Sequence, residues 1–172
     1  MTLLTIGHGT LEAERFADLL AASDVGRVVD MRRLPTSGHN PQFGRSRIEE
    51  WLPQNHIIYR WEPDLGGFRR AETNSPNTGL RNRSFRGYAD YMAAPAFLAA
   101  LERLLAEARR SRTAVMCSET LWWRCHRRLI ADAATLLRGI DVVHLMHDGS
   151  ARPHVVTECA VATDSTVRYP PE

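Results

Sequence analysis

Residues 113–138, TAVMCSETLWWRCHRRLIADAATLLR, contain a short apolar segment, a polar loop and an amphipathic segment in succession. The first four residues, 113–116, are typical of a buried strand. Apolar residues at helical spacing follow the loop, and Gly139 is a suitable stop signal. The pattern therefore predicts a strand, a loop, and then a helix from Arg124 or Cys125 to about Arg138.

The same order of elements recurs on both sides of this stretch. Strands are expected at residues 2–6, 27–31, 56–59 and 141–145, and helices at 11–22, 45–53 and from Pro95 onward. Strands that alternate with helices indicate a mostly parallel sheet with helices on both faces. We expect a Rossmann-like three-layer α/β sandwich of about five strands, with residues 1–172 forming a single domain. The tail from His147 is expected to add an edge hairpin and to fray from Ser165.

The composition excludes several classes of protein. The chain has 172 residues, of which 44% are hydrophobic and 24% charged, which excludes collagen, coiled coils and bulk disorder. No apolar run approaches the roughly 18 residues of a membrane helix, and the first residues do not resemble a signal peptide. The three cysteines lack the spacing of a disulfide framework. We therefore expect a cytoplasmic protein without a membrane partner.

All 22 basic residues are arginines, and lysine is absent. Chemistry based on an activated lysine amine or a P-loop lysine is therefore excluded. Arginine presents a planar, permanently charged fork that suits phosphate and carboxylate groups. Mutational bias toward arginine codons is the alternative explanation.

Residues 62–87 show no helical or strand period and contain two prolines and four glycines. An irregular segment of this length inside a compact domain is usually functional or disordered, and we expect a lid or a binding loop. Arg83 and Arg86 flank Phe85, a combination that suits a nucleotide or a nucleic-acid strand. A solvated loop is the alternative.

The unusual polar residues follow the expected strands, where ligands bind in open parallel sheets. His8 lies between two glycines after the first strand, and Asp30, Arg32 and Arg33 lie at the end of the second, with Asn40 further along the same loop. We expect His8, Asp30, Cys117 and His126 to meet in one cleft. A loop histidine with satisfied hydrogen bonds and a simple Asp–Arg ion pair are the alternatives.

Cys117 is the candidate nucleophile. A thiol at a strand end that faces a helix N-terminus, with Arg124 and Arg127 nearby, has a lowered pKa. Six residues separate Cys117 from Arg124, whereas cysteine phosphatases and rhodaneses use five in the same strand–loop–helix context. Glu119 is the candidate general acid or base, and His126 and Asp30 complete the expected catalytic set. A small buried structural cysteine is the alternative.

The same segment also permits a divalent metal, with Cys117, Glu119 and His126 as candidate ligands. Cys125 and His126 are adjacent, so on a helix their side chains would diverge by about 100°. We therefore do not expect both of them to bind one ion.

Several segments resemble a known family. They are Thr5–Thr10, Val28–Ser37, Asn40–Phe43, Leu65–Gly67, Arg83–Tyr91, Met116–Glu119 and Cys125–Ile130. In these segments and in their order along the sequence, the chain resembles the bacterial and archaeal family called domain of unknown function 488. The resemblance implies an α/β fold with the Cys-x-Glu and Cys-His-Arg segments as hallmarks, and it implies no established reaction.

These observations favour an enzyme that acts on a phosphate-bearing ligand such as a nucleotide or nucleic acid. Four arginines would hold the anion, namely Arg32, Arg33, Arg124 and Arg127, with His8, Asn40, Arg83 and Arg86 as further ligand-binding candidates. One alternative is a metal-dependent hydrolase or redox enzyme that uses Cys117, Glu119 and a histidine. Another is a non-catalytic nucleic-acid-binding module.

Overall fold

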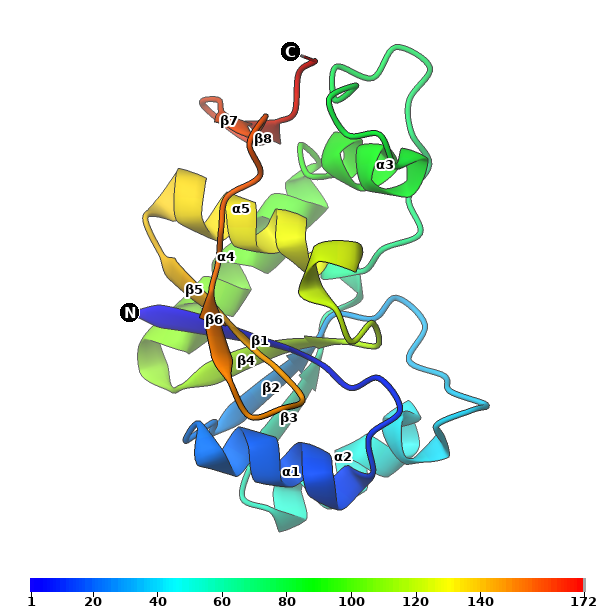
Figure 1. Ribbon diagram of the computed structural model, residues 1–172, viewed down its shortest axis with the longest axis vertical. Coiled ribbons are helices and arrows are strands. Elements are labelled where there is room, and N and C mark those ends of the chain that lie inside the picture. The colour runs from blue at the N-terminus through cyan, green and yellow to red at the C-terminus, as the bar shows by residue number, and fades with distance from the viewer. Residues whose placement is uncertain (172) are drawn as a thin grey trace.

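A six-stranded sheet forms the middle layer of the protein (Figure 1). The computed structural model describes residues 1–171. The strand order is β3-β2-β4-β1-β5-β6; the first five strands in the chain run parallel and β6 is antiparallel to β5. The strands are β1 (Thr2–Gly7), β2 (Arg27–Asp30), β3 (Ile58–Trp61), β4 (Thr113–Cys117), β5 (Asp141–Leu145) and β6 (Ala151–Pro153).

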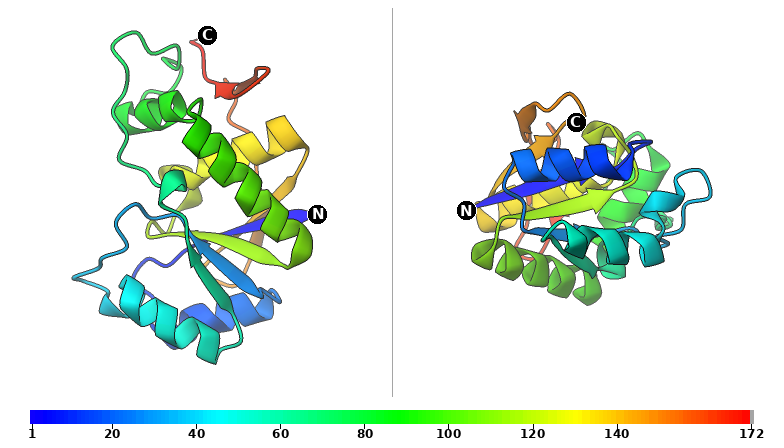
Figure 2. Two further views of the ribbon diagram at one scale, coloured as in Figure 1. Left: turned by 180° about the vertical axis from the view of Figure 1, so that it is seen from behind. Right: turned by 90° about the horizontal axis from the view of Figure 1, so that it is seen from below.

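Helices cover both faces of this sheet (Figure 2). Helices α1 (Ala13–Ala22) and α2 (Arg45–Gln54) pack on one face, where Leu4 and Ile6 of β1 join their core. Helices α4 (Pro95–Arg110) and α5 (Arg127–Arg138) pack on the other face with Leu3. Successive strand residues point to opposite faces, so one buried strand serves both cores. The predicted three-layer α/β fold is confirmed.

The parallel register brings the carboxyl ends of β1, β2 and β4 to one edge. Gly7 is paired with Cys117, and Asp30 with Met116. The chain leaves β1 and β2 toward the face of α1 and α2, whereas it leaves β4 toward the face of α5. Connections that diverge in this way open a crevice at the carboxyl edge of the sheet.

Residues 62–87 include the start of a helix that the sequence pattern did not predict. Helix α3 spans Arg83–Tyr91, and the Asn82 side chain caps it by accepting hydrogen bonds from the backbone N–H groups of Ser84 and Phe85. Gly87 lowers helix propensity, but a Cβ there would collide with the backbone of residues 69–71. Close packing against that backbone therefore requires the glycine and overrides the propensity.

The irregular part of this segment is tied to α3. The Asp90 carboxylate accepts hydrogen bonds from the backbone N–H of Glu72 at 2.8 Å, from Ser75 at 2.6 Å and from Asn77 at 2.8 Å. The segment therefore forms a strap across one end of the domain, and its opening as a lid stays a prediction.

The C-terminal tail is more ordered than the sequence indicated. Strands β7 (Val161–Ala162) and β8 (Val167–Arg168) form a small hairpin. Tyr169 is fully buried, and its hydroxyl donates to the Asp132 carboxylate of α5 at 3.0 Å. The same carboxylate accepts from Thr157 and lies 2.9 Å from His154. The expected fraying from Ser165 is therefore wrong, because a buried carboxylate anchors the tail.

None of the helices within residues 1–171 has the length and apolar character to cross a membrane.

Candidate functional site

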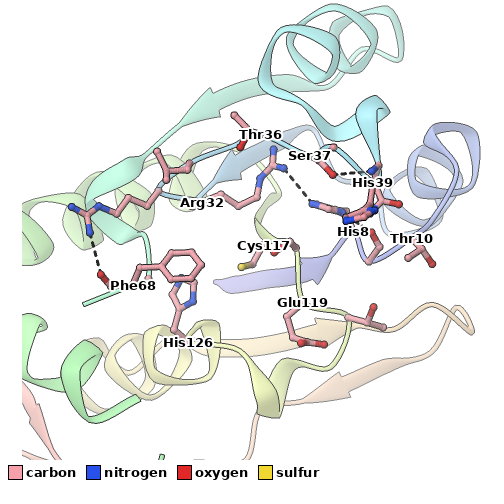
Figure 3. A pocket seen from close by; sticks show the side chains of 18 residues that line it. His8, Thr10, Arg32, Thr36, Ser37, His39, Phe68, Cys117, Glu119 and His126 are labelled. Carbon is pink, nitrogen blue, oxygen red and sulfur yellow. Dashed lines mark hydrogen bonds between the residues drawn. The ribbon is translucent and has the colours of Figure 1, made fainter. Parts of the chain in front are cut away.

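A cleft of about 630 Å³ lies at the carboxyl edge of the sheet. The loops after β1, β2 and β4 form most of its wall, and residues 67–68 close one side (Figure 3). Seven of the residues expected at a site line it: His8, Arg32, Arg33, Asn40, Cys117, Glu119 and His126.

The Cys117 thiol lies at the floor of this cleft. Its side chain is almost entirely buried at the end of β4, and the Cys125 thiol and the His126 ring lie beside it, with one ligand atom of each of the three within 4.8 Å of the others. The neighbouring Cys125 thiol, His126, Arg127 and the backbone N–H of Glu119 together hold the pKa of Cys117 well below its usual range, despite burial. Burial and the charge on Cys117 raise the pKa of Cys125. The two directions are opposite, so Cys117 is the cysteine of the pair that loses its proton more readily.

Arg127 is a buried cation near this cysteine pair. Its guanidinium donates to the backbone carbonyls of Glu119 at 2.6 Å and Thr120 at 2.7 Å, and the residue is 1% exposed. Within residues 1–171, no carboxylate lies within 4 Å of it. A buried cation without a carboxylate favours an anion nearby, which agrees with the lowered pKa of Cys117. Arg127 therefore holds the loop after β4 in place and is not among the residues that line the cleft.

Gly7 explains the close packing between this loop and β1. A Cβ at Gly7 would collide with the Glu119 carbonyl and with the Arg127 guanidinium. The backbone N–H groups of His8 and Gly9 donate at 2.9 Å to the carbonyls of Cys117 and Ser118. The glycine therefore allows the two loops to continue side by side beyond the strands.

Asp30 lies beneath the cleft and does not line it. Its carboxylate is fully buried and accepts from the Arg32 Nε at 2.9 Å, the Arg32 Nη2 at 2.6 Å and the Tyr59 hydroxyl at 2.6 Å. Asp30 therefore holds the Arg32 guanidinium in place. The charge of Arg32 is largely neutralised by this pair, which leaves Arg33 as the exposed cation of the cleft wall.

His8 is held in one orientation by both ring nitrogens. Nδ1 lies 2.8 Å from the Gly9 carbonyl, so it carries the proton, and Nε2 accepts from Arg32 Nη1 at 3.2 Å. The ring stacks on Phe43 with centroids 4.2 Å apart. Burial lowers the pKa of His8 to about 4. His8 is therefore a neutral wall of the cleft at pH 7.

Cys125 and His126 both point toward Cys117, contrary to the expectation from helical spacing. Helix α5 begins only at Arg127, and Cys125 has extended backbone angles of φ −116° and ψ 148°. One ligand atom from each of Cys117, Cys125 and His126 lies within 4.8 Å of the others. The correction has a simple cause, since the 100° divergence applies only within a helix. Glu119 is not part of this cluster, and its carboxylate accepts from the backbone N–H of Leu121 at 3.2 Å.

Besides Arg127, three of the expected ligand-binding arginines lie outside the cleft. Arg124 is exposed on the turn before α5. Arg86 donates to the Leu80 carbonyl at 3.0 Å, and Arg83 lines a separate groove with Arg69 and Arg70.

The sequence interpretation missed Phe68 at the mouth of the cleft. It is 87% exposed and has a positive φ of 59°. The signal was the run Gly66-Gly-Phe-Arg-Arg70, in which an aromatic residue stands between two glycines and two arginines.

Fold and site together define an α/β protein with a doubly wound sheet and a buried cysteine pair in a polar cleft at its carboxyl edge. Residues 12–134 match the family model described as domain of unknown function DUF488. The chain belongs to this family, as its motifs indicated. Comparison with curated proteins gave no match, and comparison with solved structures gave none.

Proposed function

We propose that the cleft is the active site of a cysteine-dependent enzyme that acts on a phosphate-bearing ligand, with Cys117 as the nucleophile. The observation that carries the proposal is the Cys117 sulfur in the cleft, with a second thiol and the His126 ring beside it and a buried arginine without a carboxylate partner nearby. A thiolate stabilised in this way is the reactive form of cysteine. Three free cysteines suit a reducing compartment such as the cytoplasm.

The cleft offers the groups that a phosphoryl transfer needs. The Cys117 sulfur would attack phosphorus, a sulfur–phosphorus bond would form, and the bond to the leaving oxygen would break with its electron pair. Glu119 is exposed in the cleft wall and would donate a proton to that oxygen, then accept one from the water that hydrolyses the intermediate. Arg33 and Asn40 face the ligand charge, whereas Arg32 acts mainly through His8.

Alkylation across pH tests the nucleophile directly. We expect iodoacetamide to label Cys117 before Cys125 and Cys159 in the native protein, with an apparent pKa below the free value of about 8.5. Replacing Cys125→Ala removes the thiol donor and is expected to raise that apparent pKa. Mass mapping of the labelled peptides gives both results, and inorganic phosphate is expected to slow the labelling of Cys117.

Cys159→Ser is the matched control, because Cys159 lines a different pocket. This variant should leave the labelling of Cys117 unchanged. If Cys117 resists labelling until the protein unfolds, and chelators do not expose it, the nucleophile assignment is wrong.

A metal-dependent hydrolase or redox enzyme is the second candidate function, favoured by the convergence of Cys117, Cys125 and His126. Two thiolates and an imidazole suit zinc and softer metals. Three protein ligands would leave a fourth position open toward the cleft, as in catalytic zinc sites.

Metal analysis separates the two candidates. On the metal reading, the purified protein carries about one equivalent of zinc or a softer metal, and Cys125→Ser and His126→Ala each lower that content strongly. Elemental mass spectrometry of the native protein and the two variants measures this. Metal content below a tenth of an equivalent after expression in zinc-supplemented medium would remove this candidate.

A further inference from the structure

Phe68 combines two energetically unfavourable features, an exposed aromatic side chain and a positive φ. Its side chain is 87% exposed, and its φ of 59° lies in the left-handed region that residues other than glycine rarely adopt. Backbone outliers of this kind persist where the surrounding structure enforces them, and they gather at ligand sites.

The surrounding backbone fixes Phe68 in this position. A Cβ at Gly66 would lie 2.7 Å from the backbone nitrogen of Arg33, and a Cβ at Gly67 would lie 3.0 Å from Nδ1 of His126. Arg33 Nη1 also donates to the Phe68 carbonyl at 3.1 Å. Gly66 and Gly67 therefore pack closely against the cleft wall just before Phe68, and the Phe68 ring extends into the cleft mouth.

The ring faces the space where a ligand would lie. Figure 3 shows Phe68 beside His126 and across the cleft from His8, with Cys117 between the two sides. Leu34, which is 71% exposed, lines the same cleft. The mouth of a polar cleft therefore carries two exposed apolar side chains.

Two arginines follow Phe68 in the chain. Arg69 and Arg70, together with Arg83, line a separate groove of about 510 Å³. Within residues 1–171, no carboxylate lies within 4 Å of these three guanidinium groups or of Arg33. Glu72 and Asp90 lie along the adjoining groove, where three hydrogen bonds already occupy Asp90.

We propose that Phe68 is the stacking platform for a nucleobase, so that the ligand of the cleft is a nucleotide, free or within a single strand. The base would stack on Phe68 while its phosphate lies near Arg33 and Cys117, and phosphates of neighbouring nucleotides in a strand would lie along the arginine groove. This inference rests on the proposed function, because it identifies the phosphate-bearing ligand of the same cleft.

Calorimetric titration with adenosine 5′-monophosphate and ribose 5-phosphate tests the base contact. We expect the nucleotide to bind about 10-fold or more tightly than the sugar phosphate, since base–aromatic stacking accounts for factors of this size. Phe68→Ala should abolish the difference, and Phe68→Trp should keep it. Phe68→Gly should also abolish it without lowering the melting temperature, because glycine adopts this φ without strain. Protection of Cys117 from iodoacetamide places the bound nucleotide in the cleft.

The two proposals fail in different ways. Equal affinities of nucleotide and sugar phosphate, with or without Phe68, would overturn the stacking inference and leave the proposed function standing. If the protein binds neither compound and does not bind inorganic phosphate, both proposals are overturned.

Titration with deca-deoxyadenylate distinguishes a free nucleotide from a nucleotide within a single strand. Tighter binding of this strand, weakened by Arg70→Gln and Arg83→Gln, identifies a single strand, and unchanged affinity in these variants identifies a free nucleotide.

Discussion

Replacing Asp30→Ala is expected to lower the free energy of unfolding by about 3–5 kcal/mol, because it leaves the buried Arg32 guanidinium without its carboxylate. Arg32 is 6% exposed and donates to Asp30 through its backbone N–H, Nε and Nη2. Tyr59 also loses the acceptor of its hydroxyl. Denaturant unfolding of the variant and the wild type measures the difference.

The double variant Asp30→Ala/Arg32→Met tests the cause. It removes the unpaired charge along with the carboxylate, so we expect it to recover part of the lost stability. Glu49→Ala is the matched control, because its ion pair with Arg45 is exposed to solvent and contributes little to stability. A loss for Asp30→Ala no larger than that of the control would contradict the positioning role of this pair.

Acid is expected to destabilise the fold well before most carboxylates are protonated. Burial lowers the pKa of His8 to about 4 and that of His144 to about 3. His144 is fully buried, stacks on Trp122 at 4.1 Å and lies 3.0 Å from His154. Arg127 and His154 lower its pKa further. Both histidines are therefore neutral in the folded protein at pH 7.

The direction of the effect follows from proton uptake. Between pH 6.5 and 4 the unfolded chain protonates both histidines and the folded protein does not, so stability falls as the pH falls through this window. At about 1.4 kcal/mol per pKa unit, each histidine is expected to lower the free energy of unfolding by on the order of 3 kcal/mol when the pH falls to 4. Unfolding curves at half-unit pH steps measure the loss.

Two substitutions assign this loss to particular residues. His144→Asn should lower stability at pH 7 but flatten its pH dependence between 6.5 and 4. His56→Asn is the control, because His56 is exposed, and the slope should stay that of the wild type. A wild-type stability that is constant across this window would show that the histidines are not buried in their neutral forms.

The alternation of strands and helices could be predicted from the sequence because it leaves a local signal. Apolar spacing identified β1, β4 and β5 closely, and Pro95 marked the first residue of α4. The missed helix α3 has a weak local signal, since Gly87 interrupts it, and its stability comes from packing. Strand ends also identified the edge at which Cys117, His126 and Arg33 line one cleft.

The roles within that edge depended on the path of the backbone through the loops. Whether Cys125 faces Cys117 depends on where α5 begins, and a shift of two residues changes the answer. Arg127 and Arg124 look alike in the sequence, but one is buried under the loop and the other is exposed. The sequence by itself determined the α/β fold, the family and the position of the cleft, because these follow from local periodicity and motif order. Only the tertiary structure decided which polar groups line the cleft and which form buried contacts instead, because burial and hydrogen-bond partners arise from residues distant in the chain.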